Sequence, residues 1–279
     1  MLVVIGTVVV TLDGLVIDPR AASVCADDPM LLRGDGVFET VLVRDGRPCL
    51  LGAHLARLAT SAAITGLPAP EPARWRHAVA AAVGNWAHPG DAVLRLLLGR
   101  ARTLAFVTVS AVPERAVTAR RDGIAAVTLE RGPSASAPWS LAGVKSLSYA
   151  ANAAALRHAQ RIGADDVVFV AADGTVLEGP RSAVLIATED GELLTPPASL
   201  PILPGTTVGA LFVEARGRGL ACQEQQFGVA DLVAAQGVWL LSSVTLAARV
   251  HTLDGAPLRQ APRAAEVTDL VDAAILRAD

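Results

Sequence analysis

The 279-residue chain has little lysine, tyrosine and cysteine, and the shortage of cysteine already limits what the protein does. Its three cysteines, Cys25, Cys49 and Cys222, lie far apart and form no Cys-x-x-Cys pair, so we expect neither a disulfide framework nor a zinc site. The five histidines show no metal-ligand spacing, and no metal is expected. No apolar run approaches the roughly 18 residues of a membrane-spanning helix, so no membrane partner is expected either.

The chain also lacks a strong charge of one sign. The net charge of −3 is not the basic excess typical of nucleic-acid binders, so a nucleic-acid partner is excluded. With 52% hydrophobic and 18% charged residues, the composition excludes long disorder. Residues 1–10 have no basic region and no small-residue cleavage site, and they predict a first strand instead of a signal peptide. We therefore expect a cytoplasmic protein with a small-molecule partner.

Lys145 is the only lysine among 24 basic residues. The chain thus uses arginine wherever it needs positive charge alone, but arginine cannot supply a neutral amine because its pKa lies above about 12. An imine with an aldehyde or ketone requires lysine, which makes Lys145 a candidate for amine chemistry. The alternative is an ordinary surface lysine. The only tyrosine, Tyr149, follows four residues later, one turn away on the same face if this segment is helical.

The pattern of turns predicts a mixed α/β (α+β) chain with two domains. Asp-Gly pairs flanked by β-rich runs predict hairpins, and helical stretches alternate with them. Predicted strands cover residues 37–44, 47–51, 91–98, 104–112, 166–171, 175–177, 183–187, 192–195, 238–241 and 247–253. Predicted helices cover residues 53–65, 72–86, 148–162, 206–218 and 264–276. The charged segment 113–122 is the predicted linker, between a smaller domain at 1–112 and a larger one at 123–279.

Two glycine-containing turns differ in what they indicate. Gly34-Asp35-Gly36 is not a dinucleotide fingerprint, because no third glycine follows and the next element is a predicted strand. The run Leu203-Pro204-Gly205-Thr206-Thr207 predicts a turn that opens a helix. Free N–H groups and the helix dipole make such a start a phosphate site, although an ordinary helix cap has the same appearance.

Lys145 and Tyr149, taken together with Arg57 and Glu178, match the groups that one cofactor needs. Pyridoxal phosphate (PLP) needs a lysine for its aldehyde, an acid for its ring nitrogen and donors for its phosphate. Lys145, Glu178 and Arg57 supply these groups, and the Tyr149 phenol is available for the ring oxygen. Alone, Arg57 is equally well explained as a solvated arginine or as one paired to an acid. Glu178, at a strand end, is alone explained as an exposed acid or, less well, as a buried and paired one.

Five motifs in order along the chain resemble those of the class IV aminotransferase family, the fold-type IV PLP enzymes. They are Gly34-Asp35-Gly36-Val37-Phe38-Glu39-Thr40, His54-Leu55-Ala56-Arg57-Leu58, Lys145-Ser146-Leu147-Ser148-Tyr149, Glu178-Gly179-Pro180 and Leu203-Pro204-Gly205-Thr206-Thr207. The resemblance implies two α/β domains with PLP between them, usually in a homodimer. It implies that Lys145 forms the Schiff base and carries the proton, with Tyr149 and Glu178 at the cofactor ring. The phosphate residues it implies are Arg57, Gly205, Thr206, Thr207 and, with a weaker match, Ser243.

The family contains three activities that differ in how the substrate carboxylate is held. Branched-chain aminotransferases typically have Tyr-x-Arg on a first-domain strand, but this chain has Val93-Leu94-Arg95. D-amino-acid aminotransferases typically have a tyrosine where Phe38 stands and an Arg-x-His clamp, which residues 100–103 lack. The motifs resemble 4-amino-4-deoxychorismate lyases better. The resemblance therefore implies release of 4-aminobenzoate and pyruvate, in folate biosynthesis.

Three alternatives to the lyase stay open, and the substrate residues can also be explained in other ways. A D-amino-acid transaminase, alone or as a second activity, is the main alternative, and a branched-chain aminotransferase fits less well. A family member that only binds a ligand is a third, although the intact cofactor residues argue against it. The residues expected at the anionic substrate are Phe38, Arg95, Arg100 and Arg181. The arginines are equally explained as structural ion pairs or, for Arg181, as a solvent-facing side chain.

Overall fold

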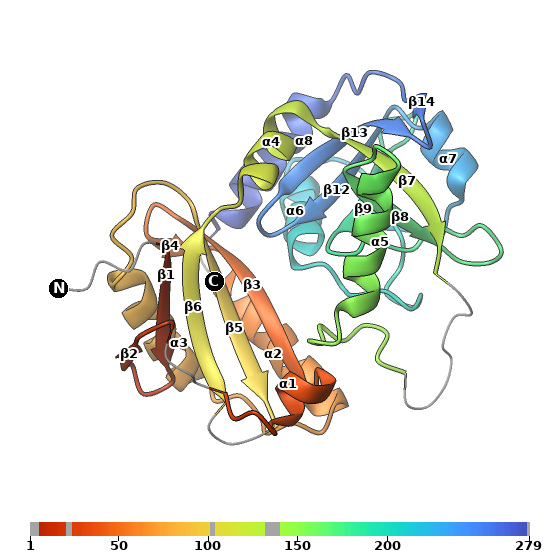
Figure 1. Cartoon of the computed structure of the whole chain (residues 1–279). Helices are drawn as coiled ribbons and strands as arrows, with labels where there is room; N and C mark the ends of the chain where they lie inside the picture. The colour runs from red at the N-terminus through yellow and green to blue at the C-terminus, as the bar shows by residue number, and fades with distance from the viewer. Residues whose placement is uncertain (1–5, 21–23, 101–103, 132–139, 278–279) are drawn as a thin grey trace. The chain divides into compact units, whose positions relative to one another are not determined.

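The computed structural model describes residues 6–20, 24–100, 104–131 and 140–277. The chain divides into two compact units, which are described separately (Figure 1). The first unit contains the residues up to Pro113 together with Val144–Tyr149, and the second contains Glu114–Gly143 and Ala150–Arg277. Lys145 therefore belongs to the first unit although helix α5, which follows it, belongs to the second.

The first unit is an antiparallel sheet with helices on one face. Its strand order is β2-β1-β6-β5-β3-β4. The strands are β1 (Thr7–Thr11), β2 (Val16–Ile17), β3 (Gly36–Arg44), β4 (Arg47–Pro48), β5 (Ala92–Gly99) and β6 (Ala105–Ala111), and the helices are α1 (Pro29–Arg33), α2 (Leu51–Ile64) and α3 (Pro72–Gly84). Val37 and Val41 of β3 and Leu94 and Leu96 of β5 pack with α2 and α3 in one core. Because side chains alternate along a strand, Phe38 of β3 and Arg95 of β5 lie on the opposite face.

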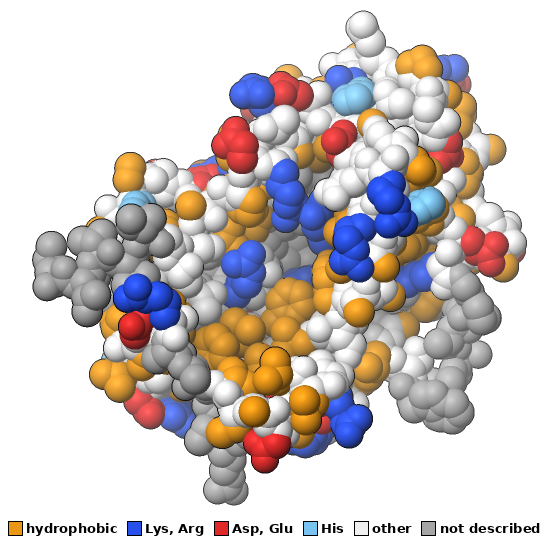
Figure 2. Space-filling view, viewed as in Figure 1, with side chains coloured by type: hydrophobic (Ala, Val, Ile, Leu, Met, Phe, Trp, Pro, Cys, Tyr) orange, Lys and Arg blue, Asp and Glu red, His pale blue; other side chains and the backbone are white. Residues whose placement is uncertain are grey.

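Helix α1 is short and buries none of its side chains. Asp28 caps its start by accepting a hydrogen bond from the Met30 N–H at 2.8 Å, and Gly34 ends it in the left-handed conformation at φ 65°. Leu31 and Leu32 are 62% and 59% exposed. Hydrophobic side chains gather over α1 on the face seen in Figure 2. Such a surface is typical of a contact with another protein.

The second unit is built on a mixed sheet of eight strands. Its order is β11-β10-β9-β12-β13-β7-β8, and β14 pairs with β13. The strands are β7 (Ile124–Glu130), β8 (Asp166–Val170), β9 (Ala183–Ala187), β10 (Leu193–Thr195), β11 (Cys222–Glu224), β12 (Gly237–Ser242), β13 (Leu246–Leu253) and β14 (Ala256–Pro257). The helices are α4 (Glu114–Asp122), α5 (Ala150–Arg161), α6 (Thr206–Gly217), α7 (Val229–Ala234) and α8 (Ala264–Ile275). Strand β7 runs parallel to β8 and β13, whereas the hairpins β9–β10 and β12–β13 are antiparallel.

The structure confirms the predicted α/β class and most of the predicted elements. Strand β1 coincides with the end of the predicted first strand, whose residues 1–5 lie outside the described residues. The segment 113–122, expected to be a linker, forms α4 from residue 114 onward. Its Ala116 and Ala119 are buried and most of its charged side chains are exposed, while Arg120 is part-buried, so its polar composition reflects an amphipathic helix. Residues 175–177 form only isolated bridges, between Val176 and Val170 and between Thr175 and Gly228. No helix in the described part of the chain is long and apolar enough to cross a membrane.

Candidate functional site

The segment around Lys145 is held in the first unit through its main chain. The Phe38 N–H donates to the Lys145 carbonyl at 3.0 Å, and the Leu147 N–H donates to the Gly36 carbonyl at 2.9 Å. The Lys145 N–H donates to the hydroxyl of Ser61, a fully buried residue of α2, at 3.3 Å. Lys145 is thus fixed from both sides, by β3 and by α2.

The Lys145 amine lies over the ring of Phe38. Its Nζ is 4.7 Å from the ring centroid, and the Tyr149 ring packs edge-on against the same ring at 5.9 Å between centroids. The predicted helix begins at Ala150 instead of Ser148, so residues 145–149 are not helical and the condition for placing Lys145 and Tyr149 one turn apart is not met. Pairing with β3 uses the main-chain groups that a helix needs. Phe38 brings the amine and the phenol together, and its expected contact with the substrate stays a prediction.

Arg57 of α2 is fixed by a buried carboxylate on β3. Its Nε and Nη2 donate to the two oxygens of Glu39 at 2.7 and 2.8 Å, and Glu39 is fully buried. The Nδ1 atom of His54 lies 2.7 Å from the same carboxylate. Burial raises the pKa of Glu39, but the charge and hydrogen bonds of Arg57 and the hydrogen bond of His54 outweigh it and lower the pKa to about 2. Burial lowers the pKa of His54, so the neutral ring donates its Nδ1–H to Glu39.

Neither Glu39 nor His54 was expected to serve the site. The sequence nevertheless contained a signal, because Glu39 occupies an inward-facing position between the core residues Val37 and Val41. An acid at such a position needs a cationic partner, and Arg57 is that partner. The buried carboxylate therefore determines how the Arg57 guanidinium is oriented.

Arg95 of β5 lies on the face of the first sheet opposite α2 and α3, the face that also carries Phe38. It is half-buried, and burial lowers its pKa, although an arginine stays charged. Among the described residues its one hydrogen bond is to the Ser110 hydroxyl, at a long 3.4 Å, and no carboxylate pairs with it. A half-buried guanidinium without an acid is suited to an incoming carboxylate.

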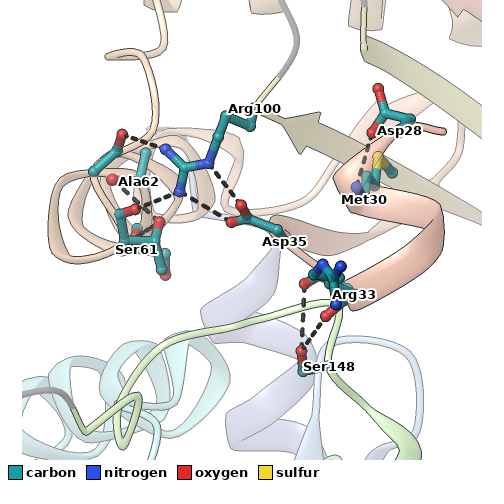
Figure 3. A network of polar contacts seen from close by, with 11 residues as sticks. Asp28, Met30, Arg33, Asp35, Ser61, Ala62, Arg100 and Ser148 are labelled. Carbon is teal, nitrogen blue, oxygen red and sulfur yellow. Dashed lines mark hydrogen bonds and ion pairs between the residues drawn. The ribbon is translucent and has the colours of Figure 1, made fainter.

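Arg100 has a different environment, shown in Figure 3. It forms an ion pair with Asp35 and donates to the carbonyls of Thr65 and Gly66. Its hydrogen bond lowers the pKa of the Asp35 carboxyl. These contacts support the interpretation of Arg100 as a member of a structural ion pair.

In the second unit, the Glu178 carboxylate receives two donors. Arg131 donates to one oxygen at 2.5 Å, and the Leu203 N–H donates to the other at 3.0 Å. The Arg131 guanidinium also lies over the Phe169 ring, 5.3 Å from its centroid. Glu178 is thus paired, not simply exposed at a strand end. Sequence reasoning missed Arg131 because it is 47 positions away and belongs to no recognised motif.

The start of α6 has the local structure that the sequence predicted. Gly205 caps the helix in an extended conformation, and the first helical hydrogen bond runs from the Gly209 N–H to the Gly205 carbonyl. The amides before Gly209 thus belong to the first turn, where N–H groups point out of the helix. A Cβ at Gly205 would lie 2.8 Å from Val208 Cγ1, so glycine is needed there. Thr206 and Thr207 open the helix as predicted.

Two other predicted residues also lie in the second unit. Ser243 occupies the turn between β12 and β13. Arg181 pairs with the buried carboxylate of Asp166 at 3.1 Å and borders a cavity of about 300 Å³ next to α4. The ion pair gives Arg181 a structural role, and its contact with substrate stays a prediction.

The donor sets of the two units fit the chemistry of PLP. The first unit supplies an amine beside an aromatic ring and an arginine oriented by a buried carboxylate. The second supplies a paired carboxylate and a helix start with two threonines. An aldehyde, a pyridine nitrogen and a phosphate are the groups that such side chains bind.

Comparison with known proteins agrees with this chemistry. Residues 36–253 match the profile of the family described as amino-transferase class IV. A Mycobacterium tuberculosis protein named bifunctional aminodeoxychorismate lyase / D-amino acid transaminase is 52% identical over 96% of this chain and 99% of its own. A hypothetical aminotransferase from the same organism, in its PLP-bound form, superposes with a TM-score of 0.94 at 52% identity, over 96% of this chain and 99% of that one. The fold IV transaminase of Curtobacterium pusillum is 38% identical, with a TM-score of 0.87 over 97% of both chains.

Proposed function

The chain belongs to the class IV aminotransferase family, and from this premise we propose that it is a PLP-dependent 4-amino-4-deoxychorismate lyase that also transfers amino groups of D-amino acids. The relative from Mycobacterium tuberculosis, which carries both activities in its name, supports the pair. The structural observation that carries the proposal is the placement of the only lysine. Its amine lies over Phe38, on the sheet face that also presents Arg95.

The residues that hold PLP are proposed from both units. Lys145 takes the aldehyde, Tyr149 donates to the ring oxygen and Glu178 binds the ring nitrogen. The phosphate is held by Arg57, Gly205, Thr206, Thr207 and Ser243. When bound, PLP supplies an aldehyde and a ring that accepts electrons from the reacting carbon.

Each side chain then has a defined task. Lys145, as a neutral amine, removes the proton from the amine-bearing carbon of the substrate. Glu178 keeps a proton on the ring nitrogen, because Arg131 and the Leu203 amide stabilise its carboxylate charge. Arg95 holds a substrate carboxylate. The two activities share the proton removal and differ in the next step, since pyruvate leaves in the lyase and Lys145 returns the proton in the transaminase.

The test is release of 4-aminobenzoate from aminodeoxychorismate by PLP-loaded protein, with K145A as the control. We expect product that depends on Lys145. A second assay follows amino transfer from D-alanine to 2-oxoglutarate, in which K145A should also be inactive. Absence of 4-aminobenzoate from a PLP-bearing protein that does transfer amino groups would reduce the proposal to the transaminase, and absence of both would overturn it.

The assembly and the location of the protein are also proposals. We propose a homodimer, supported by the exposed apolar side chains of α1, Leu31 and Leu32. We propose a cytoplasmic location, supported by Cys25, Cys49 and Cys222, which are all free thiols. Sedimentation of the purified protein tests the dimer, and fractionation of cells tests the location.

A further inference from the structure

Arg100 joins two elements of the first unit. Its guanidinium donates to the two oxygens of Asp35 at 2.6 and 3.0 Å, and to the carbonyls of Thr65 and Gly66 at 3.0 and 3.1 Å (Figure 3). Thr65 directly follows α2 as its C-cap, and Asp35 directly precedes β3. These contacts therefore fasten the end of α2 to the start of β3.

The same two elements hold the main chain of Lys145. Ser61 of α2 accepts the hydrogen bond of the Lys145 N–H, and Phe38 of β3 donates to the Lys145 carbonyl. The position of these two peptide groups thus depends on the separation of α2 and β3. The ion pair between Arg100 and Asp35 constrains that separation.

A second link joins the Lys145 segment to the turn that contains Asp35. The Ser148 hydroxyl lies 3.3 Å from the Arg33 carbonyl and 3.4 Å from the Gly34 carbonyl, to which it donates. A Cβ at Gly34 would come within 2.7 Å of that hydroxyl oxygen and 3.0 Å of the Ser148 main-chain nitrogen. The turn approaches Ser148 this closely only because residue 34 has no side chain.

We propose that Arg100 and Asp35 are positioning residues that place the Lys145 amine for its reaction with PLP. The proposal rests on the function proposed above for Lys145. A guanidinium has five N–H donors, and four of those of Arg100 are used by protein acceptors. This occupancy favours a positioning role over the substrate contact that the sequence suggested for Arg100.

The test compares R100Q and D35N with R44Q. Arg44 pairs with Asp91 at 3.3 Å at the other end of the same strands, so R44Q removes an ion pair of the same kind away from Lys145. Lys145 is the only lysine, so reductive methylation by formaldehyde and borohydride, followed by mass spectrometry on the peptide that contains it, reports its amine in the absence of PLP and separates it from the α-amine. We expect R100Q and D35N to change the methylation rate by about threefold, the scale of a partly exposed ion pair, and R44Q to leave it unchanged.

A second readout is the affinity for PLP, measured by absorbance titration. We expect Kd to rise by about threefold to tenfold in R100Q and D35N, with the double variant no worse than the more affected single variant, because both remove one interaction. If Arg100 contacts the substrate instead, R100Q should raise only the KM for the substrate and leave the methylation rate and the PLP affinity unchanged. That result would overturn the proposal. If R100Q does not fold, D35N decides the question. If the wild-type chain does not bind PLP, the proposed function fails, whereas the methylation rates still decide whether Arg100 and Asp35 position Lys145.

Discussion

The guanidinium of Arg131 donates to the carboxylate of Glu178 at 2.5 Å, within the second unit. The acid proposed for the ring nitrogen of PLP is therefore itself held by a cation. A cation at this distance favours the ionised carboxylate, so the proton shared with a pyridine nitrogen stays on the ring. A protonated ring is the form that accepts electrons from the reacting carbon.

Removal of the Arg131 charge should impair catalysis. We expect R131M to lower kcat by about tenfold, the scale of one charge-assisted hydrogen bond, because Glu178 then competes for the ring proton. R131K is the matched variant, since it keeps the charge and should retain most of the activity. Steady-state kinetics of the two PLP-loaded variants make the comparison. Equal losses in R131M and R131K would assign the effect to packing on Phe169 instead of charge.

Glu39 should contribute stability with a defined pH dependence. Its pKa of about 2 in the folded chain lies below the usual value of about 4.3, so its contribution is complete above roughly pH 4.5 and is lost as the pH falls toward 2. We expect E39Q to lower the free energy of unfolding at pH 7 by about 3 kcal/mol, because it leaves Arg57 partly buried without its partner. Urea unfolding at several pH values measures the difference, which should shrink below pH 4.5. A difference that is constant with pH would contradict the assignment, and D91N, at a more exposed pair, is the control.

Arg95 should affect substrate affinity more than cofactor affinity. We expect R95Q to raise KM for aminodeoxychorismate by about tenfold or more, because a charge-assisted hydrogen bond to a carboxylate is lost. The PLP affinity should stay at the wild-type value. Kinetics and absorbance titration of the same preparation separate the two. Weaker PLP binding with an unchanged KM would show that Arg95 does not contact the substrate.

Gly34 and Gly46 provide a matched pair of glycine substitutions in the first unit. Both have positive φ, 65° and 70°, but only at Gly34 would an added methyl group have neighbours within 4 Å, and these belong to Ser148. We expect G46A to cost about 1–2 kcal/mol of stability from the backbone conformation alone. G34A should cost at least ~1 kcal/mol more and weaken PLP binding, because Ser148 must move. Denaturant unfolding and PLP titration measure both, and equal effects of the two variants would argue against close packing at Ser148.

The sequence predicted most of the elements because their signals are local. The pair Asp45-Gly46 marks the hairpin β3–β4, Asp190-Gly191 marks the hairpin β9–β10, and Gly205 with Thr206 marks the start of α6. Tertiary contacts account for the errors. The segment before Ala150 is extended because β3 binds its main chain, and α4 is polar because it buries little more than two alanines. Neither effect has a local sequence pattern.

In the candidate site too, the residues with a local signal were predicted and their distant partners were not. Lys145 stood out because no other lysine exists, and Glu178 because a motif surrounds it. The partners that orient the site residues, Arg131 and Glu39, come from distant positions and were not predicted. Arg95 and Arg100 were equivalent candidates in the sequence, and only their contacts separate them.

The central claim is that Lys145 is the amine that carries PLP. Its most direct test is borohydride reduction of the PLP-loaded protein, followed by proteolysis and mass spectrometry of the peptides. The account predicts one pyridoxyl group per chain, on the peptide that contains Lys145, and none in K145A. Bound PLP that leaves Lys145 unmodified after reduction, or an equal amount of fixed cofactor in K145A, would contradict it.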